Sequence, residues 1–146
     1  MGVEKDLLSS SMMKDALSFI DRESDTIEKA ESVLAFCVAF LAKGQSDDDL
    51  RILLEFVRVQ IPDTHGGDRM FHAPQSGITP DQSELEDICA KVVDEYIDPM
   101  LDIASRDLVL FGFASALFWI HKNVPIGDQD RDIVERVLMK IRGKIS

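Results

Sequence analysis

Residues 108–120 read LVLFGFASALFWI, a run with no charged side chain and with a single hydroxyl, that of Ser115. A helix on a protein surface shows one apolar stripe, whereas this run is apolar nearly all round, as a buried helix would be. A membrane span needs roughly 17–25 apolar residues, so the run is too short to be one. We therefore predict an all-α bundle of about six helices around a central apolar helix at about residues 106–122.

Apolar side chains recur at helical spacing over most of the remaining chain. No strand-like alternation and no internal repeat interrupts this pattern. A chain of 146 residues is long enough to bury one sizeable core, which predicts a single domain over residues 1–146. The other predicted helices are 4–20, 25–43, 46–61, 79–98 and about 128–142.

Polar side chains at the predicted boundaries indicate how the helices begin. Asp25, with Glu28 three positions on, resembles a capping box, and Ser46 precedes a helix whose first turn is acidic. Thr79 is the expected N-cap of the fourth helix. Gly44 is the expected stop of the second.

The sequence does not decide how many helices follow the fourth helix. The Asp98-Pro99 pair ends or kinks that helix, because proline lacks a backbone N–H and restricts the residue before it. Residues 99–122 then form either one helix or two helices joined near Ser105.

Residues 62–79 form the longest stretch without periodicity, and connections of this length tend to be functional or disordered. Two imidazoles and two carboxylates there could bind zinc, iron or manganese, although their spacing matches no common ligand pattern. A plain surface loop or a partner contact is favoured over a metal site. These potential ligands are Asp63, His65, Asp68 and His72.

The net charge is −11, and it is concentrated in the middle of the chain, where residues 62–102 hold ten acids and two bases. Such a field repels nucleic acid and anionic membranes and favours partners with a basic surface. The fourth helix is expected to present an acidic face opposite its apolar stripe. The residues of that face are Glu84, Asp87, Asp94 and Asp98.

Met70 and Phe71, close to Asp68, form an apolar pair inside the otherwise polar loop, as an interface anchor rimmed by charge would. Together with the acidic helix, this pair favours a protein-binding module that neutralises a basic partner. Inhibitors and immunity proteins have the same general character. One rival is a small metal-dependent hydrolase that uses the loop ligands or helix carboxylate pairs such as Glu28 with Glu31. Another is a homo-oligomer that associates through the loop.

The remaining reactive side chains favour structural roles. Cys37 and Cys89 lie in apolar helical patterns and are expected to be buried free thiols. His121 closes the central helix, where its charge would suit the helix dipole. No nucleophile has a visible activating neighbour. Motifs that carry chemistry are also absent, and no cofactor is expected. The acidic N-terminus does not resemble a signal peptide, and a cytoplasmic location is the default expectation.

Overall fold

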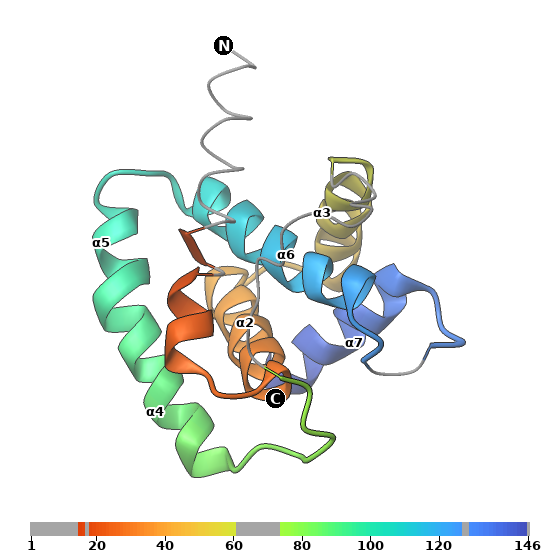
Figure 1. Cartoon of the computed structure of the whole chain (residues 1–146). Coiled ribbons are helices and arrows are strands. Elements are labelled where there is room, and N and C mark those ends of the chain that lie inside the picture. The colour runs from red at the N-terminus through yellow and green to blue at the C-terminus, as the bar shows by residue number, and fades with distance from the viewer. Residues whose placement is uncertain (1–14, 17, 61–73, 127–128, 146) are drawn as a thin grey trace.

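The computed structural model describes residues 15–16, 18–60, 74–126 and 129–145 (Figure 1). These residues are helices and connections, with no strand among them, which confirms the predicted all-α bundle. If the unbroken run α4–η1–α5 is counted as one, the described residues form six helices. They are residues 15–23 (residue 17 apart), α2 (Ile27–Leu41), α3 (Asp47–Gln60), α4 (Gln82–Val92) with η1 (Val93–Ile97) and α5 (Asp98–Leu101), α6 (Arg106–Asn123) and α7 (Ile133–Ile145).

The predicted apolar helix is α6, and it lies at the centre of the bundle, in contact with α2, α3, α5 and α7 (Figure 1). Its aromatic side chains Phe113 and Phe118 are almost fully buried in the hydrophobic core, and the Phe113 ring packs against Tyr96 of η1 with ring centroids 5.7 Å apart. Within the described residues, no helix has the length and hydropathy needed to cross a membrane.

The structure resolves residues 99–122 into two helices, α5 and α6, separated by residues 102–105. Ser105 caps α6, because its hydroxyl accepts a hydrogen bond from the Leu108 backbone at 3.2 Å. The Arg106 guanidinium then donates to the carbonyls of Leu41 and Phe40, at 2.8 and 2.9 Å. Those carbonyls end α2 and lack partners within their own helix, so Arg106 ties the start of α6 to the end of α2.

Two predicted helix starts were wrong. Thr26, not Asp25, caps α2, and its hydroxyl accepts from the Lys29 backbone at 3.3 Å. The Asp25 carboxylate instead forms an ion pair with the Lys29 side chain at 2.8 Å. In α4 the N-cap position belongs to Asp81, two residues after the predicted Thr79, because residues 74–80 follow a non-helical path set by contacts with α2.

The last helix also begins later than predicted, at Ile133 instead of about residue 128. Asp132 accounts for the difference, since its carboxylate accepts a hydrogen bond from the Val134 backbone at 3.2 Å. The predicted start at Ser46 is confirmed, whereas α2 ends at Leu41, two residues before the predicted end at residue 43. Ser46 accepts from the Asp49 backbone at 3.2 Å, and Gly44 has a φ of 93°, a left-handed conformation that suits glycine.

Asp98-Pro99 does not end the fourth helix. The five residues before Asp98 form the π-helical turn η1, in which the Asp98 N–H donates to the Val93 carbonyl five residues back. Such a wide turn commonly accommodates a local break in the usual hydrogen-bond ladder, and proline introduces one because it has no N–H. The helix therefore continues through Pro99 into α5 and carries the chain to the start of α6.

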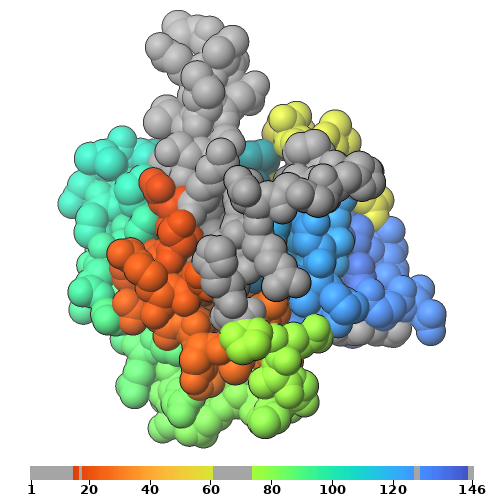
Figure 2. Space-filling view, in the orientation of Figure 1, coloured from red at the N-terminus to blue at the C-terminus, as the bar shows by residue number. Residues whose placement is uncertain are grey.

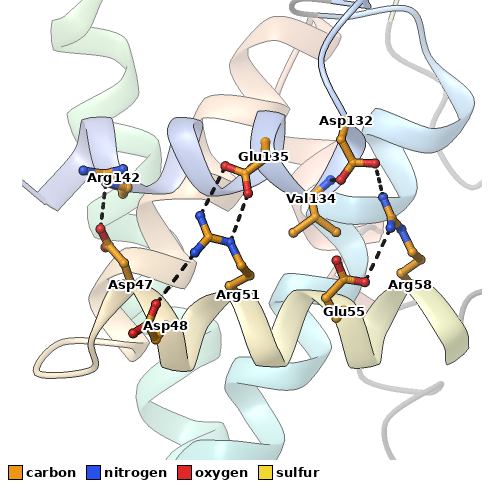
Figure 3. Close-up of polar contacts among 9 residues, drawn as sticks. All are labelled: Asp47, Asp48, Arg51, Glu55, Arg58, Asp132, Val134, Glu135 and Arg142. Atoms are coloured by element: carbon orange, nitrogen blue, oxygen red, sulfur yellow. Dashed lines mark hydrogen bonds and ion pairs between the residues drawn. The ribbon is translucent and has the colours of Figure 1, made fainter.

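Charged side chains join α3 to α7 along the outside of the bundle (Figure 3). Arg51 of α3 faces Glu135 of α7 with two parallel contacts, at 3.0 and 3.3 Å. Arg142 lies 3.2 Å from Asp47 at one end of this row, and Arg58 pairs with Asp132 at the other. The basic side of α7 is thus partly neutralised within the fold.

Candidate functional site

Residues 81–102, which comprise Asp81, α4, η1, α5 and Asp102, form an acidic arm along one side of the molecule (Figure 1). The arm contacts α2 along α4 and α6 near its far end, and it buries a narrow apolar stripe of Leu85, Cys89, Val92 and Ile97. Figure 2 shows the arm as one edge of the molecular surface.

Every carboxylate of the acidic arm belongs to an exposed residue, and Lys91 is the arm's single base. The four residues predicted from the sequence are among them, and the structure adds as many again. The helix buries only its narrow stripe, so acids well outside the predicted face also reach solvent. The eight acidic residues are Asp81, Glu84, Glu86, Asp87, Asp94, Glu95, Asp98 and Asp102.

Two lysines neutralise part of this charge. Lys29 of α2 lies against both Asp25 and Glu84, and Lys91 lies 2.9 Å from Glu23 and 4.0 Å from Glu95. Within the described part of the chain, the other six carboxylates of the arm have no ion-pair partner. The arm therefore presents a surplus of unpaired negative charge to solvent.

The predicted acidic residues do not share one narrow face. Glu84 and Asp87 border a hollow that also includes Lys29, on the side of the arm next to residues 22–25. Asp94 borders a different groove, beside Phe36 and Lys144. The negative charge is therefore spread around the exposed side of the arm. The loop residues predicted for partner or metal binding, Asp63, His65, Asp68, Met70, Phe71 and His72, lie outside the described residues.

A second candidate site is organised by Glu28, which holds the segment 74–80 against α2. One carboxylate oxygen accepts from the Ser76 backbone at 3.0 Å, and the other accepts from the Gly77 backbone at 2.6 Å. Gly77 has a φ of 73°, which favours glycine at this turn. Burial alone would raise the pKa of Glu28, but the hydrogen bonds from Ser76 and Gly77 outweigh it and hold the pKa below its ordinary value.

One turn further along α2, Glu31 is buried at 4 % exposure and lies between two basic side chains. Its Oε2 lies 2.6 Å from His121 Nε2 at the end of α6, within ion-pair distance although not aligned as a hydrogen bond. Its Oε1 lies 3.2 Å from Lys140 Nζ on α7. Burial raises the pKa of Glu31, but the His121 contact and the Lys140 charge outweigh this effect and lower the pKa overall.

Glu31 and Glu28 face a cleft of about 520 Å³ between α2, the segment 74–80, the end of α6 and α7, which we call the basic cleft. Two arginines and one lysine line it against these two carboxylates. The other residues that line the cleft include both polar and apolar side chains. The lining residues that bear on its chemistry are Arg131, Arg136, Lys140, His121, Ile78 and Met139.

Arg136 is the least satisfied side chain in the basic cleft. Its Nε and Nη1 atoms are shut off from solvent and have no hydrogen-bond partner in the described structure. The Nδ1 atom of His121 is in the same state. Buried polar atoms are nearly always hydrogen-bonded, so these unsatisfied atoms in side chains that line the cleft need a partner that the described residues do not supply.

The sequence predictions for this region need correction. Glu28 and Glu31 do not form a free carboxylate pair, because one holds the segment 74–80 and the other contacts His121 and Lys140. No group of three potential metal-ligating His, Cys, Asp or Glu side chains converges within the described residues. His121 does lie in the last turn of α6, near the predicted end, but its contact with Glu31 was missed because the two residues are ninety positions apart.

The two cysteines are free and buried, as predicted. Burial raises the pKa of both thiols, that of Cys89 to about 11, so neither is a ready nucleophile near neutral pH. No protein-family model, curated protein or solved structure matches this chain.

Proposed function

We propose that the protein works by binding another protein through its acidic arm, and that the partner presents a basic surface. The observation that carries this proposal is the set of six exposed carboxylates on the arm that lack a cationic partner among the described residues. Unpaired surface charges of one sign steer an oppositely charged partner and accelerate its association. An inhibitor or an immunity-type protein that neutralises a basic toxin or nuclease would have this character.

The distribution of charge supports the arm as the contact surface. The basic residues Lys140 and Arg142 of α7 are engaged with Glu31 and Asp47, so the charge of the arm is not balanced by them within the fold. Ile103, 78 % exposed, comes directly after the last acid of the arm and supplies an apolar contact beside it. An apolar residue rimmed by charge is a common arrangement in protein interfaces.

Self-association through the arm is disfavoured, because two copies would bring like charges together. An oligomer would therefore have to use another surface. Sedimentation at several protein concentrations, in low and high salt, distinguishes association through the arm from association through another surface. A self-associating species that strengthens in low salt would contradict the proposed role of the arm.

The direct test compares three forms of the full chain as bait in affinity capture from the native source. The first is the unaltered protein, and the second carries Asp87→Asn, Asp94→Asn and Asp98→Asn on the acidic arm. The third is a matched control with the same charge change elsewhere, at the exposed residues Asp15, Asp49 and Asp107.

We expect the unaltered protein and the control to retain a basic partner that salt releases, because screening weakens exposed charge contacts. The arm variant should retain at least about tenfold less of that partner, which corresponds to about 1.4 kcal/mol of binding free energy. Equal retention by the arm variant and the control, or retention that salt does not affect, would overturn the proposal.

A further inference from the structure

We propose that the basic cleft binds a small organic anion, with an oxyanion head against Arg136 and Lys140 and an apolar body against Ile78 and Met139. This site is separate from the acidic arm and takes a ligand of the opposite charge to the partner proposed for the arm. The proposal rests on the charge of the cleft, on its unsatisfied donors and on its exposed apolar rim.

The charge of the basic cleft runs against that of the whole protein. The chain has a net charge of −11, yet the cleft is lined by Arg131, Arg136 and Lys140 against the carboxylates of Glu28 and Glu31. Both carboxylates are already engaged, Glu28 by backbone donors and Glu31 by His121 and Lys140. Lys140 is paired with Glu31, and Arg131 has interactions of its own within the protein. Arg136 is therefore the cation of the cleft that a further anion would pair with.

Arg136 is the residue best suited to hold the head of that anion. A guanidinium presents paired donors that match a carboxylate or phosphate group, and two of its nitrogens here have no acceptor. Leaving a buried donor unpaired is costly, and more so for a charged group. Rotation of the side chain toward the cleft would let a bound oxyanion satisfy these donors. Lys140, four residues along the same helix, has donors to share between Glu31 and the ligand.

The apolar rim indicates the kind of body that the ligand carries behind its head group. Ile78 is 71 % exposed and Met139 is 49 % exposed, and both line the basic cleft. Half-buried Ile126 lines the same cleft. Ligand sites commonly have volumes of about 300–1,000 Å³ and combine apolar walls with a few polar groups, and this cleft meets both conditions. An aromatic or aliphatic anion suits it better than a bare inorganic ion.

The test titrates four probes into the isotopically labelled full chain at constant ionic strength, with backbone amide shifts as the readout. Phenyl phosphate and benzoate carry the oxyanion on an apolar ring, inorganic phosphate carries it alone, and benzyl alcohol is neutral. We expect at least one aromatic anion to cause saturable shifts in the amides of residues 77–79 and along α7. Which of the two binds more tightly identifies the head group as phosphate or carboxylate.

Two variants locate the binding. Arg136→Gln should weaken the aromatic anion by about tenfold or more, whereas Arg142→Gln, which removes the same charge from the same helix outside the cleft, should leave affinity unchanged. Met139→Glu adds a negative charge at the exposed rim without altering a buried group. This variant should also weaken binding of the aromatic anion, and it provides the test if Arg136→Gln does not fold.

Three results would overturn the proposal. The first is the absence of saturable binding by either aromatic anion. The second is equal weakening by Arg136→Gln and Arg142→Gln, which would indicate a general electrostatic effect. The third is inorganic phosphate or benzyl alcohol binding as tightly as the aromatic anions, because the affinity would then not depend on both the oxyanion head and the apolar body.

Discussion

Glu31 of α2 and His121 of α6 meet inside the protein, with Oε2 and Nε2 2.6 Å apart and both side chains almost fully buried. Lys140 of α7 reaches the other oxygen of the same carboxylate. One glutamate thus joins three helices at the wall of the basic cleft. A buried charge is tolerated only when it is paired, so the buried carboxylate of Glu31 depends on its contacts with His121 and Lys140.

Replacing Glu31 with alanine should destabilise the fold by about 3 kcal/mol, because it leaves the buried His121 and the partly buried Lys140 without their carboxylate. Unfolding in denaturant, followed by circular dichroism, measures the change. Glu95→Ala is the matched control, because Glu95 is exposed and its ion pair with Lys91 is long at 4.0 Å. This substitution should lower the free energy of unfolding by roughly 0.5 kcal/mol or less. Equal costs for the two variants would contradict a structural role for the Glu31 contacts.

Glu31 should also make stability depend on pH on the acid side. The pKa of Glu31 lies below its ordinary value of 4.5 in the folded protein, so the unfolded chain binds the proton first as the pH falls. The stabilisation from this group is fully present above the ordinary pKa and is lost as the pH falls through the lowered one. Glu28 contributes in the same direction.

Thermal unfolding from about pH 6 to about pH 3 tests this dependence in the unaltered protein and in Glu31→Gln. The glutamine has a similar shape and does not titrate. Its melting temperature should be lower near pH 6, and the difference between the two proteins should narrow as the pH falls. Parallel curves would show that Glu31 is not a source of the acid sensitivity.

The Arg51–Glu135 contact between α3 and α7 should contribute a small and salt-sensitive stabilisation (Figure 3). Both side chains are partly exposed, so we expect a coupling free energy of about 0.5–1 kcal/mol in a double-mutant cycle with alanine at each position. The coupling should fall markedly at about 1 M salt, where screening acts over about 3 Å. A coupling that persists unchanged in salt would mean that the two residues interact through packing.

Phe118→Ala should cost about 3–5 kcal/mol, because it opens a cavity beside α6 at the centre of the bundle. Phe56→Ala is the control, since that ring is 55 % exposed on α3 and its removal should cost roughly 1 kcal/mol or less. Denaturant unfolding of both variants gives the comparison. If Phe118→Ala remained as stable as the Phe56 variant, the central position of α6 would be wrong.

Local patterns in the sequence were enough to predict the helical class and the identity of α6. Helical periodicity repeats every few residues, and a run apolar on all sides can be satisfied only in the interior. The cap at Ser46 and the turn at Gly44 could likewise be predicted, because such residues act close to the end of their own helix. The surplus of acids on the fourth helix was also visible, since the sequence itself carries the charge.

Only the tertiary structure decided which charges are used within the fold and which remain available. Glu28 looked like half of a capping box, but its carboxylate receives donors from residues 76 and 77, nearly fifty positions away. Glu31, His121 and Lys140 come from three helices, and no local signal links residues at such separations. The physical reason is that helix periodicity fixes which side of a helix is buried, whereas the packing of one helix on another selects the partners of each buried charge.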